Sequence, residues 1–342
     1  MLYWSRRRRS SRTHGVTKRI LVTGSSGFIG SSLCYQLNDI GYKVFGIDNN
    51  KYRPLDAMHG DGGEGMNQGL HDKLLLRRLS RIDFKHATPC NLDITDQDAV
   101  DAYFDDHDKF DAVVHCAAIP SAIKTERYAQ DATKIALSGL TNILKHAKSF
   151  DKFIYLSSSM VYGNFDTPAI GECHQLRPVN LYGELKKGAE DLVRNMINEH
   201  VILRLISVYG PYDDNERVVG KLISRITQEH IVTLKKGAIL DLTYIDDVVH
   251  GIMATIENDN GNGDTFNFSY GYGYELTALV NEIRKNIIFV PQERIEQHRG
   301  SAGDPDRGVL NSEKFTETYG QQAEIGLEEG IKRTMAWRFA GG

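Results

Sequence analysis

Residues 19–30 constrain the fold more than any other stretch of the 342-residue chain. A short apolar, β-branched run ends at Thr23, three glycines follow at a spacing of three, and an apolar-faced helical pattern begins directly after them. In such a strand–turn–helix unit Gly24 allows the tight turn, Gly27 lets backbone N–H groups approach a phosphate, and Gly30 lets the helix pack closely on the strand. The pattern predicts a cradle for a pyrophosphate.

A second apolar run, residues 43–47, ends in Asp48. A carboxylate at this point can hydrogen-bond the adenosine ribose hydroxyls and repels a 2′-phosphate, so Asp48 favours NAD over NADP. Glycine turns also occur in α/β proteins that bind no dinucleotide, and the glycines alone leave that alternative open. The strand before the turn, the helix after it and the following acid together favour the cofactor site.

Strand-like and helix-like patterns alternate over most of the chain. Strands are predicted at residues 84–88, 111–118, 152–156 and 201–206. Helices are predicted at 95–103 (capped by Thr95), 125–148 and 181–198. This alternation predicts an α/β fold with a doubly wound parallel Rossmann sheet, in which ligands bind at the carboxyl ends of the strands.

The regular strand–helix alternation ends after residue 210, and helical patterns then alternate with short strands such as 265–268. We therefore predict that residues 19–210 form mainly the NAD-binding Rossmann domain. Residues 211–342 would form mainly a smaller α/β substrate-binding lobe, with chain crossings between the two. Residues 51–80 are interpreted as an insertion at the edge of the sheet, whose leucine- and arginine-rich end predicts a short helix with a solvated basic face. The later helices are predicted at 218–227, 246–257, 275–285 and 327–338.

Bulk composition excludes several classes of protein. The net charge of −4 suggests neither a nucleic-acid nor a membrane partner, and no apolar run approaches the roughly 20 residues that span a bilayer. The four cysteines lie far apart without a CxxC pair, which argues against zinc and disulfides and fits a reducing, cytoplasmic setting. Residues 1–18 are strongly basic and lack the apolar core of a secretory signal, so we predict a disordered tail.

Tyr182 and Lys186 lie four residues apart in a predicted helix and therefore share one of its faces. A free tyrosine, with a pKa of about 10, is a poor base at neutral pH. A lysine cation one turn away, together with the positive nicotinamide ring, stabilises the phenolate and lowers that pKa. A serine opposite could hold the reacting hydroxyl or relay its proton. We predict that Tyr182 takes a hydroxyl proton while hydride leaves the same carbon for NAD.

Together these motifs resemble the extended short-chain dehydrogenase/reductase family, and within it the NAD-dependent nucleotide-sugar epimerase/dehydratase group, which contains UDP-glucose and UDP-glucuronate 4-epimerases. The similarity runs from about residue 18 to the C-terminus. The matching stretches are residues 23–30, 48–49, 92–94, 115–118, 157–163, 182–186, 208–211 and 241–248.

The resemblance implies roles for further residues. Asp93 and Ile94 would contact the adenine, Ala117 would line the path to the nicotinamide ribose, and Ser158 would be the catalytic hydroxyl. No metal is implied. The implied cofactor-binding residues are Gly24, Gly27, Phe28, Ile29, Gly30, Asp48, Asn49, Asp93, Ile94, Ala117, Tyr182 and Lys186, and the implied catalytic residues are Tyr182, Lys186 and Ser158.

The resemblance also narrows the reaction. Dehydratases and decarboxylases of the group carry acids directly after the catalytic hydroxyl, where this chain has Ser159 and Met160. The remaining reaction is a transient oxidation of the sugar, in which the hydride returns to the opposite face of the keto intermediate. This is epimerisation of a nucleotide-activated sugar at C4. An NAD-dependent sugar dehydrogenase or reductase, and a non-catalytic dinucleotide-binding module for RNA or protein, stay open. Leu240 replaces an arginine that clamps the nucleotide diphosphate in many members, so nucleotide and sugar rest on analogy.

Members of the family commonly pair through two helices of each subunit. The patterns at 125–148 and 181–198 carry enough apolar positions for such a four-helix interface. The resemblance therefore implies a homodimer.

Overall fold

The structure is a computed structural model that describes residues 17–50, 74–78, 80–81, 87–214, 217–227, 232–235, 237–287, 295–298 and 308–340. Nearly all of the predicted basic tail and most of the predicted insertion at 51–80 lie outside these residues.

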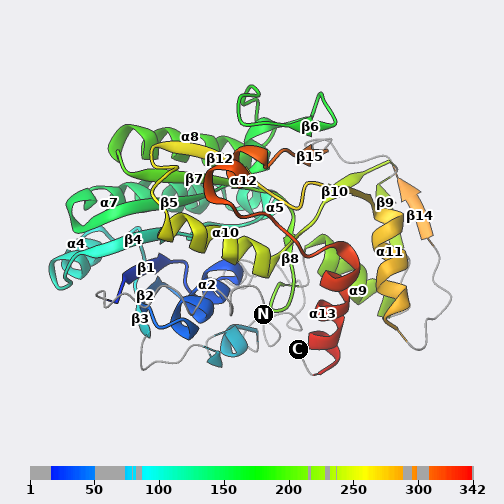
Figure 1. The fold of residues 1–342 in the computed structure, drawn as a ribbon, viewed down its shortest axis with the longest axis horizontal. Coiled ribbons are helices and arrows are strands. Elements are labelled where there is room, and N and C mark those ends of the chain that lie inside the picture. The colour runs from blue at the N-terminus through cyan, green and yellow to red at the C-terminus, as the bar shows by residue number, and fades with distance from the viewer. Residues whose placement is uncertain are drawn as a thin grey trace.

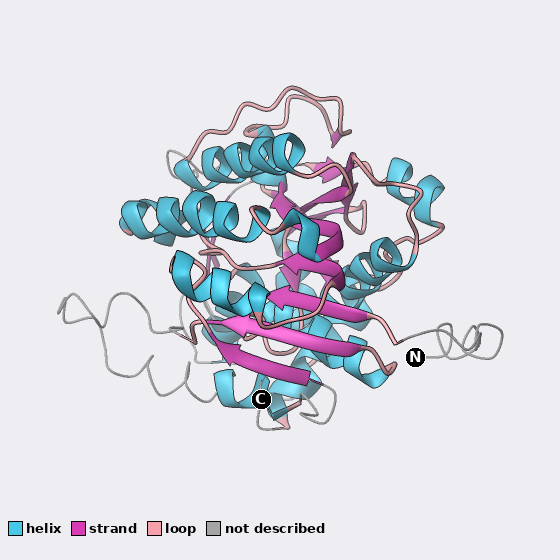
Figure 2. Cartoon of the chain, turned by 90° about the vertical axis from the view of Figure 1, so that its left-hand side faces the viewer, coloured by secondary structure: helices cyan, strands magenta, loops and turns pink. Residues whose placement is uncertain are grey.

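Among the described residues, seven strands form one sheet in which every neighbouring pair is parallel (Figures 1 and 2). Their order across the sheet is β12-β7-β5-β4-β1-β2-β3. The predicted doubly wound parallel Rossmann sheet is confirmed. The strands are β1 (Arg19–Thr23), β2 (Lys43–Asp48), β3 (Ala87–Asn91), β4 (Phe110–His115), β5 (Phe150–Ser158), β7 (His200–Leu205) and β12 (Asp264–Phe268).

One strand prediction needs correction, and another lies partly outside the described residues. The sequence pattern places residues 265–268 in the smaller lobe, but β12 lies at the edge of the main sheet, where it pairs with β7. Periodicity shows that a segment is a strand but not which partner it pairs with, because the partner lies more than 60 residues away in the chain. Residues 84–86 of the strand predicted at 84–88 lie outside the described residues, and its last two residues belong to β3 (Ala87–Asn91). The division of the chain into lobes at residue 210 stays a prediction.

Helices cover both faces of the sheet (Figure 2). On one face α2 (Phe28–Asp39) packs with α10 (Ile245–Glu257), and on the other α4 (Gln97–Asp105), α7 (Leu140–Leu144) and α8 (Leu181–Met196) surround a second core. Side chains alternate across a strand, so successive residues of β1 point into the two cores in turn. Ile20 and Val22 pack in the first core, and Leu21 packs in the second. The parallel strands between these two cores have their carboxyl ends at the same edge of the sheet.

The single helix predicted at 125–148 is broken into several elements. They are α5 (Ala122–Arg127), α6 (Ala129–Thr133), the π-helical turn η2 (Lys134–Gly139), α7 and the 3₁₀ turn η3 (Ala147–Ser149). A π turn adds one residue to the helical repeat, and the apolar pattern continues across it, so periodicity does not reveal the break. The cap predicted at Thr95 is also wrong: Asp96 caps α4 by accepting a hydrogen bond from the Ala99 amide, 3.1 Å away. Thr95 donates to Asp93 instead.

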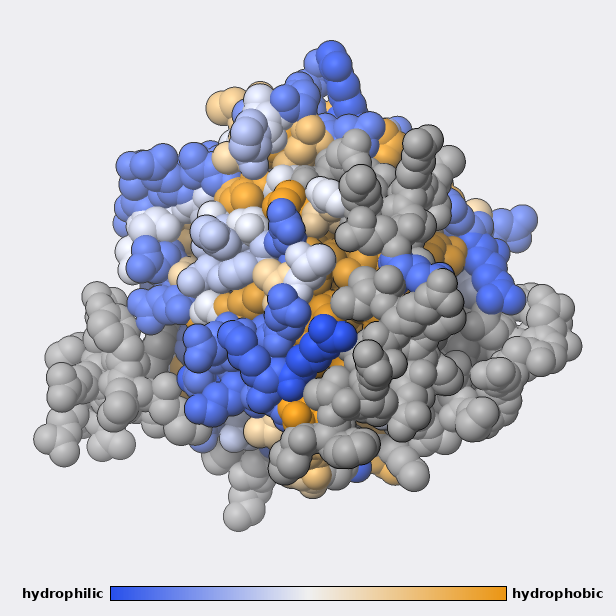
Figure 3. Space-filling model, turned by 90° about the vertical axis from the view of Figure 1, so that its right-hand side faces the viewer, coloured by the Kyte–Doolittle hydropathy of each residue, from blue (hydrophilic) through white to orange (hydrophobic). Residues whose placement is uncertain are grey.

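The helices predicted after residue 210 are confirmed to within a residue: α9 (Val218–Thr227), α10, α11 (Leu276–Lys285) and α13 (Leu327–Phe339). Whereas α10 lies over the sheet, α9, α11 and α13 lie on the right-hand side of Figure 1. Seen from that side, the described surface mixes polar and apolar areas (Figure 3). None of the helices in the described ranges has the length and apolar character to span a bilayer. The short strands are β6 (Ala169–Ile170), β8 (Val208–Tyr209), β9 (Val232–Lys235), β10 (Ile239–Asp241), β11 (Thr243–Tyr244), β13 (Gly273–Glu275), β14 (Ile295–His298) and β15 (Val309–Leu310). The other labelled helices are η4 (Ser159–Tyr162) and α12 (Glu313–Tyr319), and residues 74–78 are helical, as predicted for the end of the insertion.

Candidate active site

The glycine turn between β1 and α2 has the shape of a pyrophosphate cradle. Gly24 has φ +68°, and a Cβ added there would lie 2.7 Å from the amide nitrogen of Ala117. A Cβ on Gly30 would lie 2.1 Å from the carbonyl oxygen of Gly24, so only glycine fits at either position. Gly27 precedes the first turn of α2, which no side chain caps. The amides of this helix start are therefore available to an anion, and the residues present fit a dinucleotide.

Asp48 ends β2 beside the glycine turn. Its Oδ2 accepts a hydrogen bond from the Ser26 amide (3.0 Å) and its Oδ1 one from the Asn50 amide (2.8 Å). Burial raises the pKa of the Asp48 carboxyl. The two backbone amides fix the orientation of the carboxylate, and each of its oxygens keeps a lone pair for a ribose hydroxyl.

Asn49 and Asp93 meet at the carboxyl ends of β2 and β3. The Asn49 amide donates to Asp93 Oδ2 at 3.2 Å, and the backbone amide of Thr95 donates to Asp93 Oδ1 at 3.0 Å. The Ile94 side chain is buried against η2, where a Cβ on Gly139 would lie 2.8 Å from it. An adenine would therefore meet mainly the backbone of Ile94, and the roles predicted for these residues stay predictions.

Phe28 and Ile29 begin α2 but turn their side chains into the core. Phe28 is 6% exposed and belongs to the core on the α2–α10 face, against which Ile29 also packs. The guanidinium of Arg217 lies 5.9 Å from the Phe28 ring. Any contact of Phe28 with a cofactor would thus be made through the backbone, whereas the Ile29 side chain is only partly buried.

Tyr182 and Lys186 stand one turn apart at the start of α8, which Asn180 caps by accepting from the Gly183 amide at 2.9 Å. Lys186 is buried and donates from Nζ to the Leu156 carbonyl oxygen at 2.6 Å. Its Nζ lies 5.9 Å from the centre of the Tyr182 ring. Burial lowers the pKa of Lys186 to about 8. The ammonium is therefore held beside the phenol by a fixed backbone contact.

The start of α8 packs closely on η4, the 3₁₀ turn that follows Ser158. A Cβ on Gly183 would lie 2.5 Å from the Met160 carbonyl oxygen, so the absence of a side chain there lets the two segments approach. Ser158 caps η4, with its Oγ accepting from the Met160 amide at 3.2 Å. Ser157 and Ser159 are buried, whereas Ser158 is partly exposed. The fold thus brings Ser158, Tyr182 and Lys186 to one edge of the sheet.

A small cavity of about 20 Å³ lies beside Tyr182 and Lys186. His115 and Ala117, from the end of β4, also line it. His115 Nδ1 lies 3.0 Å from Thr23 Oγ1, and burial together with the nearby Lys186 lowers the pKa of His115 to about 3. His115 is therefore neutral near pH 7, which agrees with its interpretation as a buried structural residue and makes it a poor base.

Arg78 is a residue whose place the sequence pattern does not reveal. The pattern puts it on a solvated helix face, but it is 1% exposed. Its Nε and Nη2 donate to the Tyr212 carbonyl oxygen at 3.0 and 2.7 Å, and its Nη1 donates to the Ser26 carbonyl oxygen at 3.4 Å. A buried cation therefore lies behind the glycine turn and connects it to the loop after β8. The mixed leucine and arginine pattern of residues 74–81 does not show which arginine turns inward.

We expect Arg78→Gln to weaken cofactor retention, because it removes both the positive charge behind the cradle and the bonds that hold Ser26 and Tyr212 together. The purified variant should carry less NAD than the wild type, and its dissociation constant for NAD should rise by about tenfold, since lost hydrogen bonds to a charged group are worth about 1.5–3 kcal/mol. Arg77→Gln, next in the chain and less buried, is the matched control. Equal NAD occupancy in both variants would contradict the expectation.

The buried ammonium of Lys186 predicts a pH-dependent stability. Because the pKa of Lys186 is about 8 in the folded chain and that of an ordinary lysine side chain is 10.5, the unfolded state binds more protons between these pH values. Stability relative to Lys186→Met should therefore rise with pH across this window, by about 2 kcal/mol from pH 8 to pH 10. Urea unfolding of both proteins at the two pH values measures this difference, and a constant difference would show that Lys186 titrates normally.

Within the described ranges, no three or more His, Cys, Asp or Glu side chains gather in a way that could hold a metal ion. The chemistry suggested by the site rests on the dinucleotide cradle and on the group formed by Ser158, Tyr182 and Lys186. An α/β chain with this cradle and this tyrosine–lysine pair has the features of dinucleotide-dependent enzymes that move a hydride.

Comparison with known proteins specifies the class. The NAD dependent epimerase/dehydratase family matches residues 20–269, well over half of the chain. The chain therefore belongs to this family, and NAD is its cofactor.

Relatives cover nearly the whole chain. An uncharacterized protein of Methanocaldococcus jannaschii is 29% identical over 333 residues, which is 94% of this chain and 96% of that protein. UDP-glucuronate 4-epimerase 1 of Arabidopsis thaliana is 24% identical over 367 residues, 98% of this chain and 80% of the relative. The solved UDP-glucose 4-epimerase of Thermotoga maritima, with UDP-glucose, has a TM-score of 0.78 and 25% identity, and the match covers 94% of this chain and 99% of that one.

Proposed function

We propose that the chain epimerises a nucleotide-activated sugar at C4 through a transient keto intermediate. The observation that carries the proposal is the placement of Tyr182 beside the buried Lys186, on a helix that packs directly on the Ser158 segment. This group lies at the carboxyl edge of the sheet, where the cofactor cradle also opens.

When bound, NAD accepts a hydride from the sugar carbon and returns it. The residues of the chain handle the proton. Tyr182, as phenolate, takes the proton of the C4 hydroxyl, and the Lys186 ammonium stabilises the negative charge on the phenolate oxygen. Ser158 holds the hydroxyl in line by hydrogen bonding. Return of the proton from Tyr182 after the keto sugar has turned over restores the hydroxyl with the opposite configuration.

The residues after Ser158 favour epimerisation over elimination or decarboxylation. Ser159 and Met160 carry no carboxylate, and Ser159 is also buried, so neither offers an acid or base to the substrate. Without a carboxylate at these positions, the keto intermediate keeps its leaving groups. Hydride return is then the remaining route.

The relatives support a UDP-sugar as substrate. Two proteins similar to this chain are named as 4-epimerases of UDP-glucuronate and UDP-glucose. We therefore propose UDP-linked hexoses and uronic acids as the first candidates, in cytoplasmic carbohydrate metabolism.

The proposal includes a homodimer that pairs through residues 125–148 and 181–198 of each subunit, which span parts of α5–α7 and α8. Large apolar side chains are exposed on these helices: Ile123 on α5 is 72% exposed, and Met196 at the end of α8 is 38% exposed. Burial of such side chains between subunits is favourable. Size-exclusion chromatography with light scattering tests the dimer.

Purified protein tests the reaction. We expect it to retain NAD and to interconvert C4 epimers in a panel of UDP-, GDP-, CDP- and dTDP-sugars, detected as a chromatographic shift without change of mass and without added cofactor. Stoichiometric consumption of NADH would instead identify a reductase, and net formation of NADH a dehydrogenase. Binding of RNA or protein without turnover of any sugar would favour a non-catalytic module.

A further inference from the structure

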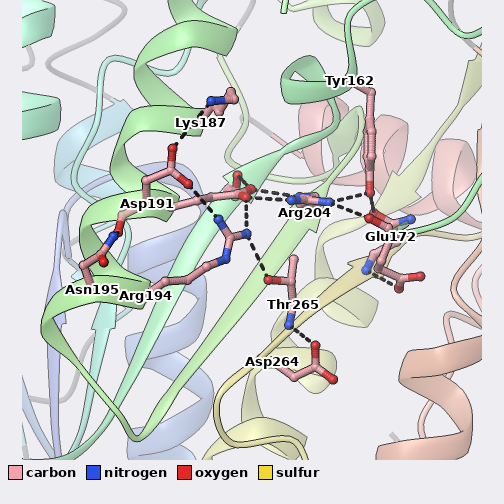
Figure 4. Close-up of polar contacts among 12 residues, drawn as sticks. Tyr162, Glu172, Lys187, Asp191, Arg194, Asn195, Arg204, Asp264 and Thr265 are labelled. Carbon is pink, nitrogen blue, oxygen red and sulfur yellow. Dashed lines mark hydrogen bonds and ion pairs between the residues drawn. The ribbon is translucent and has the colours of Figure 1, made fainter. Parts of the chain in front are cut away.

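A buried ionic network lies one helical turn beyond Lys186. Glu190, on the same face of α8, is completely buried, and Arg204 of β7 is 3% exposed. Arg204 donates to both carboxylate oxygens of Glu190, from Nε to Oε1 at 2.9 Å and from Nη2 to Oε2 at 2.7 Å. Figure 4 shows the guanidinium of Arg204 extended between this contact and Tyr162. The pair thus fixes α8 to the sheet with fork-like geometry.

The network reaches both ends of the segment that contains Ser158. On one side Ser157 donates from Oγ to Glu190 Oε1 at 2.5 Å. On the other, Arg204 Nη1 donates to the Tyr162 hydroxyl oxygen at 2.8 Å, and that hydroxyl donates to Asn267 Oδ1 at 2.8 Å. Ser157 directly precedes Ser158, and Tyr162 is the last residue of the η4 turn that follows it. The same two charges therefore contact the helix of Tyr182 and the segment of Ser158.

Both charged groups of the network have hydrogen-bond partners that stabilise their charged forms. Burial acts to raise the pKa of Glu190, but the bonds from Arg204 and Ser157 outweigh it and hold this pKa below its usual value. Burial likewise acts to lower the pKa of Arg204, and the bonds from Glu190 and Tyr162 hold it above its usual value. Both groups thus stay charged at all physiological pH values. Fully bonded buried networks of this kind hold their members in one arrangement.

We propose that Glu190 and Arg204 are positioning residues, which set the separation of Ser158 from Tyr182 through Ser157 and Tyr162. This inference rests on the proposed function, in which Ser158 and Tyr182 act on one substrate hydroxyl. Neither Glu190 nor Arg204 touches the reacting atoms. They act by holding two segments, far apart in the chain, in one fixed relation.

The test removes single hydroxyls, because loss of either buried charge would leave its partner unpaired and could unfold the chain. Ser157→Ala deletes the bond from Ser157 to Glu190, and Tyr162→Phe deletes the bonds of the Tyr162 hydroxyl to Arg204 and Asn267. The matched control is Arg194→Gln, which removes a fourth bond to Glu190, at 2.6 Å, from the solvent side of α8. Each protein is purified with its NAD, and turnover is measured with UDP-glucuronic acid and UDP-glucose.

We expect kcat to fall at least tenfold in Ser157→Ala and in Tyr162→Phe, with KM and NAD content unchanged, because misplacement by about 1 Å can cost 100-fold in rate. Arg194→Gln should keep the wild-type kcat. A purely structural role would lower Tm in the two variants and leave kcat of the folded, NAD-bound enzyme unchanged. That result would overturn the inference.

A second measurement does not depend on turnover. Crystal structures of the NAD-bound wild type, Tyr162→Phe and Arg194→Gln give the separation of Ser158 Oγ from the Tyr182 hydroxyl. We expect it to change in Tyr162→Phe only. If Tyr182→Phe retains full activity, the proposed function fails while this separation still tests the positioning. If Tyr182→Phe is inactive and the separation and kcat are the same in all other variants, only the positioning role is wrong.

Discussion

Tyr182→Phe should lower turnover of the active UDP-sugar by about 10³-fold, within the range that a positioned acid–base group contributes. The change deletes the hydroxyl that takes the substrate proton and keeps the ring on which the packing of α8 depends. Lys186 would retain its bond to the Leu156 carbonyl oxygen, so the site should otherwise keep its shape. NAD content and Tm of the purified variant are measured alongside, so that a loss of turnover can be told apart from a loss of cofactor or of the fold.

The control for this variant is Tyr319→Phe. The Tyr319 hydroxyl is buried and makes no hydrogen bond among the described residues, so its removal costs no bond. Turnover in this variant should match the wild type. Residual activity of Tyr182→Phe within tenfold of the wild type would assign the base to another group and end the proposed mechanism.

Gly30→Ala should abolish retention of NAD. The new Cβ would lie 2.1 Å from the Gly24 carbonyl oxygen and 3.1 Å from the Ser25 Cα, both backbone atoms that cannot rotate away. Relief of this clash requires α2 to move away from the turn, which takes its first amides out of reach of the pyrophosphate. We expect the variant to purify without NAD and to bind it at least 100-fold more weakly by isothermal titration calorimetry. Its Tm should also fall.

Gly188→Ala is the matched control, since it places the same methyl group within another helix that packs on the same sheet. Its Cβ would lie 3.7 Å from Leu137 Cδ2, an ordinary contact. Alanine favours helices over glycine by about 1 kcal/mol, so this variant should be at least as stable as the wild type and bind NAD normally. If Gly30→Ala also binds NAD normally, the close approach of α2 to the turn does not govern the cradle.

The local parts of the site could be predicted because each is specified over a few neighbouring residues. The turn at Gly24 depends on steric limits that act within the strand–turn–helix unit. The shared face of Tyr182 and Lys186 follows from the helical repeat, and the end of β2 at Asp48 follows from its apolar run. These features needed no knowledge of distant contacts.

Arg78 and Glu190 show what such reasoning misses. Arg78 lies among several arginines with similar neighbours, and its burial depends on the carbonyl oxygen of Tyr212, 134 residues later. Glu190 follows Lys186 by one turn, so the periodicity could place it on the active-site face. The role of Glu190 as a buried ion-pair partner becomes visible only when the fold places Arg204 beside it. In the sequence, Arg204 is a single charged residue in an apolar strand.

By itself the sequence determined the strand–glycine turn–helix unit, the parallel α/β architecture and the spacing of Tyr182 and Lys186, because backbone sterics and side-chain periodicity act over short distances along the chain. Only the tertiary structure decided that β12 joins the main sheet, that Arg78 turns inward behind the cradle, and that Glu190 and Arg204 meet between α8 and β7. Each of these depends on which distant segment supplies the hydrogen-bond partner that makes burial of a polar group or a strand edge favourable.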